Sequence, residues 1–560
     1  MVFMIIISVF ILQLCILRVF SFNLTILHNN DIHSRMVPTN KHGEDCLDEY
    51  DKNCFGGIAR LVYKTKLLRK QIPNLLYLNA GDTFVGTVWY TLFKWKILAE
   101  VVKRMRFNAM SFGNHEFDDG VEGLAPYVKE VAKFVPTLAC NLDVSKEPRL
   151  RDLVHKSFIF NIEGRKVAVI GYVTPETAEI SAPGPTLKFN DEIECIKNEV
   201  KRLKHHGINI FIALGHSGFE FDKKIAQQVP DIDIVVGGHT NTFLWNGKPP
   251  SNEVPIDKYP VVIHHRDGRI TLVVQAFAFT KYLGFLNVSF DQRGNIIKYG
   301  GQPILLDYKV PGDIMIKKFL ATKENILKQK FDKPIGTTNV LLNGECRPHE
   351  CNLGNFITDV MIYSVAKETR MNTKNGFCKY PAAFMNGGGI RASIDNKKKN
   401  GKITLRDVFR VLPWKNEILA LHIPGYILKR VFEHSVSKLH PNITDLYGAF
   451  LQVSGFKVKY DLSKPVGQMV RQLQIRYGKG CFGQHYESIN NHKYYNVLTT
   501  DYMAKGGDVY SMLRKVKHIN FNMVLLDKVI EFIKQHSPIK SQLENRSQFI
   551  GDQREMILKG

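Results

Sequence analysis

The chain has 560 residues, of which 44% are hydrophobic and 11% aromatic, and its formal net charge is +23 at pH 7. This composition excludes a disordered chain, and the length predicts two or more folded domains. The positive charge favours weak binding of polyanions, whereas the basic run NKKKNGK (residues 396–402) reads as a solvated surface, and no motif of a specific nucleic-acid-binding module is present.

The chain begins with MVFMIIISVFILQLCIL, a run without a charged side chain, followed by Arg18 and a polar step near Ser21. We predict that residues 1–21 are a secretory signal peptide; the alternative is an uncleaved membrane anchor, although the run is shorter than a bilayer span. The closing segment ENRSQFIGDQREMILKG lacks the hydrophobic tail of a GPI signal. We therefore expect a secreted, extracellular protein whose mature chain has neither a GPI anchor nor a transmembrane segment.

The cysteines and glycosylation sequons fit an oxidising, secretory compartment. Eight cysteines follow the predicted signal peptide: Cys46, Cys54, Cys140, Cys195, Cys346, Cys351, Cys378 and Cys481. Short loops favour the pairs Cys46–Cys54 and Cys346–Cys351, and the partners of the other four stay open. The sequons lie at Asn23, Asn287, Asn442 and Asn545.

Five short apolar runs of strand length recur in the first half, and each leads into a glycine-rich polar loop. They are NLTIL before HNNDIHSR, NLLYL before NAGDTF, FNAMSF before GNHEFDD, INIFIAL before GHSGFE, and IDIVV before GGHTNT. Helical patterns lie between them, for example at residues 192–207, where Ile193, Ile196, Val200 and Leu203 share one face. This alternation predicts a layered α/β fold.

The pattern changes near residues 303–336, where IMIKKFLATKENILKQKF predicts one charged amphipathic helix that links two domains. The second region has its own glycine-rich loop, NGGGIR, several helical patterns and the strand-like stretch LQVSGFKVKYDLS.

The loops after the five apolar runs carry side chains that can bind metal ions. In chain order they are Asp31 and His33, Asp82, Asn114 with His115 and Asp118, His216, and His239 with Asn241. Alternate side chains of a strand point the same way, so Asp31 and His33 are expected on one side of an extended chain. A single histidine in a glycine turn is more often structural than a ligand, but five such strand ends together favour a two-metal phosphoesterase centre.

The motif order DxH, GD, GNHEFD, GHSG and GGHTNT resembles the calcineurin-like metallophosphoesterase domain of the 5'-nucleotidase and apyrase family. ECRPHECNLGNFITD, FMNGGGIRASID, VLPW and AKGGD are similar to the C-terminal domain of that family. The resemblance implies an N-terminal four-layer α/β/β/α metallophosphoesterase domain (residues 22–309). A linker helix (310–332) would join it to a smaller α/β C-terminal substrate-binding domain (333–553), with rotation between open and closed forms.

The resemblance also implies two divalent cations. One would be held by Asp31, His33, Asp82 and Asn241, and the other by Asp82, Asn114, His216 and His239. The mixed ligands favour zinc, with Ca, Mg, Mn or Co as alternatives.

For catalysis, the resemblance implies a dyad in which Asp118 holds the His115 imidazole towards the scissile phosphate, with Arg35 contacting the phosphate. Glu116 and Asp119, in the same motif, are interpreted as surface residues.

Two arginines of the second domain, Arg347 and Arg391, offer planar forks for phosphate or ribose oxygens. By resemblance, the remaining nucleotide contacts are Asn386 at the base edge, Trp414 and Tyr502 on the two ring faces, and Asp508 at the ribose hydroxyls. Without the resemblance, the two aromatic residues are better explained by packing.

The missing anchor, the stretch GTVWYTLFKWK and the basic charge resemble secreted salivary apyrases of blood-feeding arthropods. We therefore expect an enzyme that hydrolyses extracellular ATP and ADP to AMP and phosphate and so opposes haemostasis. The alternatives are a soluble 5'-nucleotidase that converts AMP to adenosine, a UDP-sugar hydrolase and, from another class, a non-catalytic nucleotide scavenger.

Overall fold

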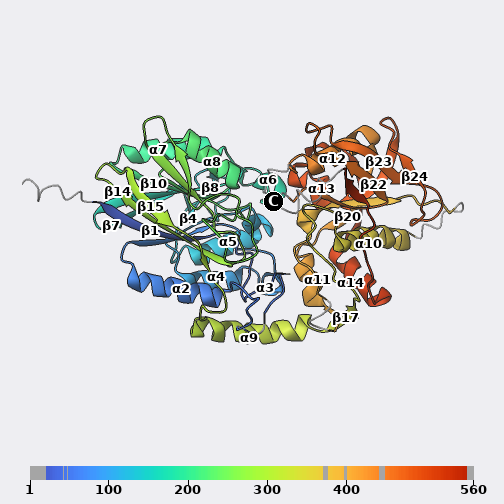
Figure 1. Cartoon of the computed structure of the whole chain (residues 1–560), viewed down its shortest axis with the longest axis horizontal. Helices are drawn as coiled ribbons and strands as arrows, with labels where there is room; N and C mark the ends of the chain where they lie inside the picture. The colour runs from blue at the N-terminus through green and yellow to red at the C-terminus, as the bar shows by residue number, and fades with distance from the viewer. Residues whose placement is uncertain are drawn as a thin grey trace, which may run out of the picture.

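A computed structural model describes residues 21–41, 43–46, 48, 50–369, 376–395, 400–439 and 448–550. Two lobes lie side by side, and helix α9 (Ile314–Phe331) runs beneath the N-terminal lobe towards the C-terminal one (Figure 1). This helix spans the residues that the charged amphipathic pattern predicts to be helical. Residues 1–20 of the predicted signal peptide, residues 396–399 of the basic run and the sequon at Asn442 lie outside the described residues.

Two sheets form the centre of the N-terminal lobe. The first has the order β15-β14-β1-β2-β3-β4-β6, with β16 also paired to β14, and the second has the order β12-β13-β11-β10-β8-β7. The strands of the first are β1 (Phe22–Asn29), β2 (Leu75–Ala80), β3 (Ala109–Ser111), β4 (Thr137–Leu138), β6 (Val154–His155), β14 (Tyr282–Phe290), β15 (Ile296–Gly301) and β16 (Ile304–Leu305). Those of the second are β7 (Ser157–Ile162), β8 (Arg165–Val173), β10 (Ile210–His216), β11 (Ile234–Val236), β12 (Val261–His264) and β13 (Ile270–Val274). A small pair, β5 (Leu142–Asp143) and β9 (Lys188–Phe189), lies apart from both.

Helices cover the outer faces of both sheets, so the predicted four-layer α/β/β/α arrangement is confirmed. On the first sheet lie α2 (Ile58–Gln71), α3 (Val88–Phe93), α4 (Trp95–Met105) and α5 (Gly120–Val131). On the second lie α7 (Glu192–Lys204) and α8 (Phe219–Gln228), while the short α6 (Thr177–Ile180) sits between the lobes (Figure 1). Helix α7 buries the four apolar residues that its pattern predicts.

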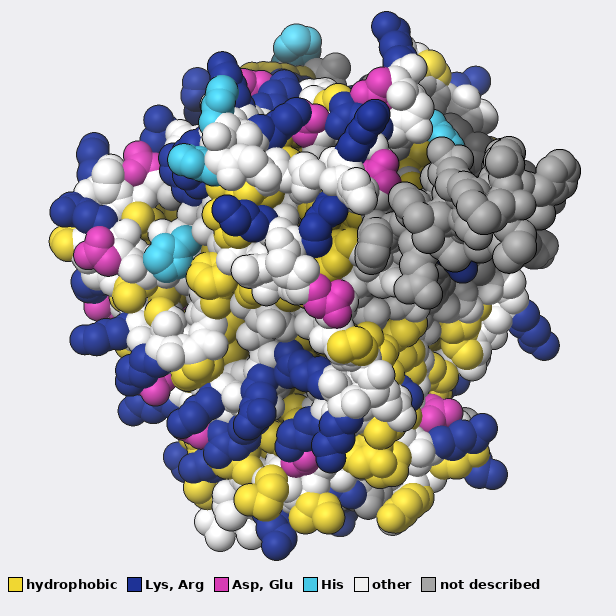
Figure 2. All heavy atoms as spheres, turned by 90° about the vertical axis from the view of Figure 1, so that its left-hand side faces the viewer, with side chains coloured by type: hydrophobic (Ala, Val, Ile, Leu, Met, Phe, Trp, Pro, Cys, Tyr) yellow, Lys and Arg dark blue, Asp and Glu magenta, His cyan; other side chains and the backbone are white. Residues whose placement is uncertain are grey.

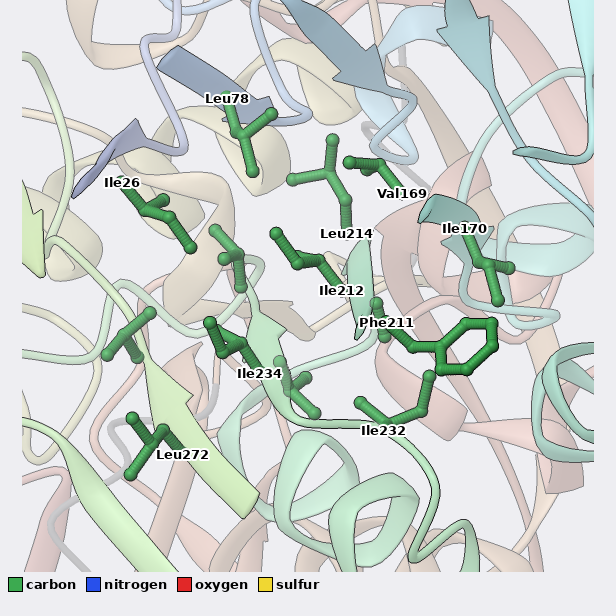
Figure 3. Packing of buried hydrophobic residues seen from close by; sticks show 14 of the residues in the cluster. Ile26, Leu78, Val169, Ile170, Phe211, Ile212, Leu214, Ile232, Ile234 and Leu272 are labelled. Carbon is green, nitrogen blue, oxygen red and sulfur yellow. The ribbon is translucent and has the colours of Figure 1, made fainter. Parts of the chain in front are cut away.

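The inner faces of the two sheets pack against each other through aliphatic side chains. Ile26 and Leu78 of the first sheet and Ile212, Leu214 and Ile234 of the second are fully buried in this layer (Figure 3). A shift of one residue in any of these strands would turn its apolar side chains out of the layer, so the register is firmly set. The ends of the strands, and the loops that follow them, are therefore held in fixed positions.

The C-terminal lobe contains a five-stranded sheet of order β21-β18-β25-β20-β26 and a four-stranded sheet of order β24-β23-β22-β27. Their strands are β18 (Ala382–Asn386), β20 (Glu417–Pro424), β21 (Leu451–Ser454), β22 (Phe456–Tyr460), β23 (Val470–Arg476), β24 (Tyr486–Ser488), β25 (Tyr494–Thr500), β26 (Lys517–Val524) and β27 (Ser547–Phe549); β17 (Pro334–Thr337) pairs separately with β19 (Lys402–Thr404). The helices are α10 (Asn352–Glu368), α11 (Leu405–Val411), α12 (Gly425–Val436), α13 (Asp501–Ala504) and α14 (Leu525–His536). The strand-like stretch LQVSGFKVKYDLS forms β21 and β22, which belong to different sheets because Gly455, at φ 71°, turns the chain between them.

Four disulfides stabilise the two lobes. Cys46–Cys54 and Cys346–Cys351 are present, as their short loops predict. The four cysteines that the sequence leaves open form Cys140–Cys195 and Cys378–Cys481. The second of these joins residues 103 positions apart, a pairing that only the folded lobe specifies.

Arg406, on α11, joins the linker helix to both lobes. Its buried guanidinium pairs with Asp45 of the N-terminal lobe at 3.1 Å, with Glu324 in α9 at 2.9 Å and with Asp332 just beyond α9. A buried arginine is stable only when its donors are satisfied, and here three carboxylates satisfy them.

The outer end of the N-terminal lobe is strongly basic. Figure 2 shows lysine and arginine side chains spread over this face, with fewer acidic ones between them. Among the described helices, none combines the length and the hydrophobicity needed to span a membrane.

Candidate metal centre

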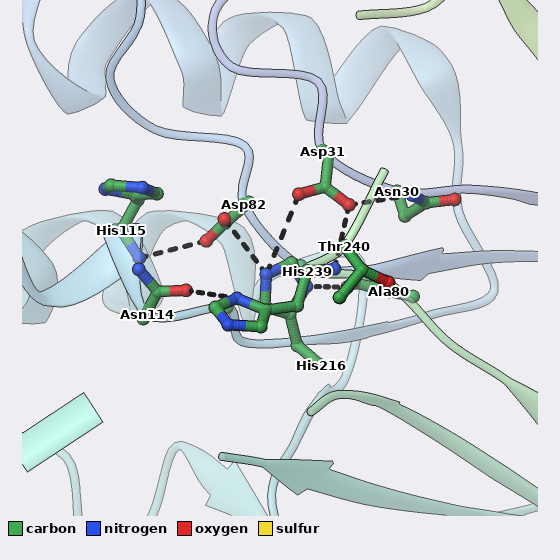
Figure 4. A network of polar contacts seen from close by, with 12 residues as sticks. Asn30, Asp31, Ala80, Asp82, Asn114, His115, His216, His239 and Thr240 are labelled. Atoms are coloured by element: carbon green, nitrogen blue, oxygen red, sulfur yellow. Dashed lines mark hydrogen bonds and ion pairs between the residues drawn. The ribbon is translucent and has the colours of Figure 1, made fainter. Parts of the chain in front are cut away.

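The five predicted loops meet at one edge of the N-terminal lobe, where the carboxyl ends of the central strands of both sheets lie together. The structure brings six of the predicted metal ligands together at this edge: Asp31, His33, Asp82, Asn114, His216 and His239, all but His33 labelled in Figure 4. The seventh, Asn241, lies in the same loop, two residues after His239. The first five are buried, and His239 and Asn241 are half-buried.

The alternate spacing of Asp31 and His33 predicts an extended strand, but the structure does not have one there. Strand β1 ends at Asn29, and both residues adopt left-handed backbone conformations, with φ of 50° and 47°. The turn still aims both side chains at one point, because His33 Nε2 lies 3.7 Å from Asp31 Oδ1. Asp82 and Asn241 share this conformation, which is unfavourable for most residues and accumulates at functional sites.

Two glycines let the loops after β2 and β3 touch. A Cβ on Gly81 would lie 2.4 Å from the backbone nitrogen of Gly113, and a Cβ on Gly113 would lie 2.1 Å from Asp82 Oδ1. Neither position has room for a side chain, which explains the glycine in each of the GD and GN motifs.

Hydrogen bonds hold Asp31, Asp82 and His216 so that one side-chain atom of each stays free (Figure 4). Asp31 Oδ2 accepts from the backbone N–H of His239 at 3.0 Å and from Asn30 Nδ2 at 2.7 Å. Asp82 Oδ1 accepts from the backbone N–H of His115 at 2.9 Å. His216 Nδ1 donates to the carbonyl oxygen of Ala80 at 2.6 Å, which leaves the lone pair of Nε2 for a metal ion.

The free atoms converge. His216 Nε2 lies 2.9 Å from Asp82 Oδ2 and 3.8 Å from Asp31 Oδ1, and His33 Nε2 lies 3.7 Å from Asp82 Oδ2. Atoms that bind one zinc ion at about 2.0–2.2 Å lie roughly 3–4 Å from one another, so this spacing fits a cation. The contact of His216 with Asp82 does not have hydrogen-bond geometry. Within the described residues, Asp31 Oδ1, His216 Nε2 and Asn241 Oδ1 are buried without a hydrogen-bond partner.

Asp82 is shared by two overlapping groups of ligand atoms. One contains Asp82, His216 and His239, and the other contains Asp82, His33 and His115; within each group the atoms lie within 4.8 Å of one another. Asn114 Oδ1 extends the first group, 3.0 Å from His239 Nδ1. A carboxylate common to two groups is what a pair of bridged cations needs.

The buried carboxylates make this edge attractive to cations. Burial opposes the protonation of His216, but Asp82 and Asp31 outweigh it and raise the pKa of His216 to about 10. Burial and the neighbouring His216 lower the pKa of His239 to about 4. The negative charge that stabilises a proton on His216 would also stabilise divalent cations.

His115 and Asp118 form the predicted pair. His115 Nδ1 lies 2.6 Å from Asp118 Oδ2, and Asp118 Oδ1 accepts from the Ser181 hydroxyl at 2.6 Å. Burial alone would lower the pKa of His115, but the Asp118 and Asp82 carboxylates raise it to about 9. With Nδ1 held by Asp118, Nε2 is left to donate to a substrate.

Glu116 is interpreted from the sequence as a surface residue, but this interpretation is wrong. Its side chain is buried, and the residue is only 2% exposed. Its carboxylate accepts from the backbone N–H groups of Asp82, Thr83, Phe84 and Gly113 at 2.6–3.0 Å. A short 3-10 turn (His115–Phe117) directs it inwards and so ties the two ligand loops together. The sequence signal that could have identified Glu116 as buried is the pair of phenylalanines on either side, Phe112 and Phe117, which are both buried. Asp119 does lie near the surface, bound to Lys94 and Tyr90.

A second buried residue that sequence reasoning missed is Gln275, which holds the GGHTNT loop. Its Oε1 accepts from the Thr242 backbone at 3.2 Å, and its Nε2 donates to the Gly238 carbonyl at 3.0 Å and to Asp222 at 2.7 Å. Nothing in its sequence context marks this role.

Three of the predicted nucleotide contacts lie together in the C-terminal lobe. Asn386 Nδ2 donates to Asp508 Oδ2 at 2.7 Å, and the Tyr502 hydroxyl donates to Asp508 Oδ1 at 2.8 Å. Asp508 has a left-handed φ of 49°, so its backbone conformation also marks a specialised site.

The predicted arginines gather where the C-terminal lobe faces the metal ligands. Arg391 lies with its Cζ 5.5 Å from the ring centre of Trp414, and burial, Arg347 and Arg35 lower its pKa to about 9. Arg35 is also buried: it donates to the Gly43 carbonyl at 3.1 Å and lies against the ring of Phe279. Buried cations that repel one another would be stabilised by a phosphate.

Trp414 reaches the candidate catalytic pair, His115 and Asp118, of the other lobe. Its ring stacks on His115 with centroids 5.7 Å apart, and its Nε1 donates to Asp118 Oδ2 at 3.3 Å. Trp414 is thus placed beside the reacting groups, whereas Tyr502 is placed beside Asp508.

Both lobes match known protein families. Residues 24–243 match the calcineurin-like phosphoesterase family, and residues 334–515 match the C-terminal domain of 5'-nucleotidase.

Full-length relatives show the same combination of domains. Protein 5NUC of Lutzomyia longipalpis is 38% identical over 95% of this chain and 93% of its own length. The snake venom 5'-nucleotidase of Crotalus adamanteus is 41% identical over 94% of this chain and 89% of its own length. Among solved structures, the 5'-nucleotidase precursor from Thermus thermophilus is 31% identical, with a TM-score of 0.82 over 95% of this chain and 100% of its own.

Proposed function

This chain belongs to the 5'-nucleotidase family and is a metal-dependent phosphohydrolase, and from that premise we propose that it hydrolyses AMP to adenosine and phosphate. The observation that carries the proposal is the carboxylate of Asp82, shared by two groups of ligand atoms at an edge that faces a cluster of arginines. The relatives named 5'-nucleotidase favour this reading over the apyrase that the sequence analysis predicts.

The proposed mechanism divides the work between the lobes. Divalent cations, zinc being the best match to the ligands, would polarise the phosphoryl oxygens and lower the pKa of water. Arg391 and Arg35 would neutralise the phosphate charge, and His115, held at Nδ1 by Asp118, would donate from Nε2 to an oxygen of the scissile phosphate. Asn386, Tyr502 and Asp508 would hold the nucleoside, so that the bond to be broken lies at the interface.

Phosphate release from AMP, ADP and ATP tests this proposal. We expect kcat/KM for AMP to exceed the values for ADP and ATP by at least about tenfold, because the chain's full-length relatives are 5'-nucleotidases. A chelator should abolish release, and added zinc should restore it. Release from ATP and ADP with accumulation of AMP would instead establish an apyrase, and binding without any release would establish the scavenger.

We also propose that the protein is secreted and glycosylated. Its relatives include snake venom proteins, and two of its sequons lie side by side on strands β1 and β14. Asn23 pairs with Ser289, and Asn287 pairs with Thr25, so each hydroxyl donates to the amide oxygen of the opposite sequon, at 2.6 and 2.7 Å. Both asparagines are exposed, and these hydrogen bonds leave their Nδ2 atoms available for a glycan.

Expression of the full chain in insect cells should therefore release a protein that carries N-glycans at Asn23 or Asn287. Mass spectrometry after enzymatic deglycosylation should find aspartate at the modified position. A protein retained in membranes would favour the uncleaved anchor, and an unmodified secreted protein would contradict the glycosylation.

A further inference from the structure

We propose that Trp414 is a positioning residue for the His115–Asp118 pair, supplied by the opposite lobe through its indole N–H. The proposal rests on the phosphohydrolase function proposed above and goes beyond base stacking, the role that the family resemblance implies for this residue.

Asp118 accepts three hydrogen bonds. His115 Nδ1 and the Ser181 hydroxyl lie at 2.6 Å, and both belong to the same lobe as Asp118. The third donor is Trp414 Nε1, at 3.3 Å, which comes from the C-terminal lobe, 296 residues away in the chain. Only this third donor depends on how the lobes approach each other.

The indole ring also limits the movement of the imidazole. Its plane is inclined by only 21° to the His115 ring, so Trp414 covers one face of the side chain that must donate to the substrate. The N–H fixes Asp118 and the ring fixes His115, so one residue holds both members of the pair. A water molecule in its place would supply a donor without a fixed direction.

Trp414 is itself fixed by the nucleotide side of the interface. It follows α11, and the Arg391 guanidinium lies 5.5 Å from its ring centre. An arginine that binds phosphate while it contacts Trp414 would link the arrival of substrate to the placement of the indole.

A second contact between the lobes lies next to Ser181, one of the three donors to Asp118. Arg514 of the C-terminal lobe forms an ion pair with Glu179 on α6, and Ser181 directly follows that helix. The C-terminal lobe therefore touches Asp118 through Trp414 and also touches the segment that carries the Ser181 donor. The pair is fully arranged only when the lobes are together.

The substitution Trp414→Phe separates donation from stacking, because phenylalanine keeps an aromatic ring but lacks the N–H. We expect kcat for AMP to fall about tenfold, as for the loss of a hydrogen bond to a charged acceptor, while KM changes less than about twofold. Trp245→Phe is the matched control. It removes an indole that donates to a backbone carbonyl, that of Lys248 at 3.0 Å, and should leave kcat unchanged.

Two further measurements distinguish positioning from base stacking. Ribose 5-phosphate has no aromatic ring to stack, so a positioning role predicts a similar fall in kcat on this substrate, and this result does not depend on AMP being the natural substrate. In an Asp118→Ala background, Trp414→Phe should have no further effect, because its acceptor is gone. An unchanged kcat on ribose 5-phosphate, or the same tenfold loss in the Asp118→Ala background, would overturn the proposal.

Discussion

Replacing Asp82 with asparagine should lower kcat/KM for AMP by about 1000-fold, an effect on the scale of removing a central catalytic group. Asp82 is common to both groups of ligand atoms, and its Oδ2 lies 2.9 Å from His216 Nε2. In the Asp82→Asn variant, an amide N–H2 placed there would donate to His216 Nε2 and occupy the lone pair that a cation needs. The remaining amide oxygen is uncharged and already accepts from the backbone N–H of His115, so it would be a much weaker ligand for divalent cations.

Asparagine is the right replacement because it keeps the shape of the side chain and tolerates the left-handed φ of 54° at this position. The variant should therefore fold, which thermal unfolding can verify. Metal content, measured by mass spectrometry of the dialysed protein, should fall together with activity.

The control for this substitution is Asp119→Asn. Asp119 belongs to the same motif as the catalytic pair, but its partners are Lys94 and Tyr90 near the surface. Its replacement should leave kcat/KM within about twofold of the unsubstituted enzyme, as expected for a surface ion pair. An Asp82→Asn variant that kept its metal and a tenth of its activity would contradict the two-metal centre.

The largest effect on stability should come from Glu116→Ala. Four buried backbone N–H groups, from two different loops, would lose their acceptor at once. Each buried donor left without a partner costs about 1–3 kcal/mol, so we expect the free energy of unfolding to fall by at least about 4 kcal/mol. Activity should be lost as well, since the same loops present Asp82 and Asn114.

Urea unfolding of the chelator-treated protein isolates the effect of these hydrogen bonds from that of bound metal. Glu122→Ala is the matched control, because this glutamate follows closely in the chain but has an 84% exposed side chain paired with Arg149. The free energy of unfolding of the Glu122→Ala variant should stay within about 0.5 kcal/mol of that of the unsubstituted protein. Equal stability of the two variants would show that Glu116 does not hold the loops.

The alternation of apolar runs and polar loops was sufficient to predict the α/β layers. It was also sufficient to place the loops with the seven candidate ligands at one edge, since the carboxyl ends of neighbouring strands must meet there. The linker helix and the apolar face of α7 followed from helical periodicity in the same way.

Contacts between distant segments could not be predicted. The turn at Asp31 and His33 depends on left-handed conformations that neither residue type requires. The inward direction of Glu116 depends on a 3-10 turn that brings it to donors of another loop. The contact of Trp414 with Asp118 depends on the placement of one lobe against the other.

The substrate was predicted less well than the chemistry. Net charge and an expected localisation describe the surroundings in which a protein works, so they carry little information about which phosphate the site accepts. The comparisons, by contrast, extend over both lobes, including the region of the C-terminal domain that contains the candidate nucleoside contacts.

The three carboxylates around Arg406 have a mechanical consequence. They belong to Asp45 in the N-terminal lobe, Glu324 in the linker helix and Asp332 just beyond that helix. Helix α11 is therefore held by three ion pairs close to where the lobes join. If the C-terminal lobe rotates away from the candidate metal ligands, the region around Arg406 can act as the hinge of that rotation. A rotation about this point would keep the three ion pairs intact, and closure would then return Trp414 and Arg391 to the same place each time.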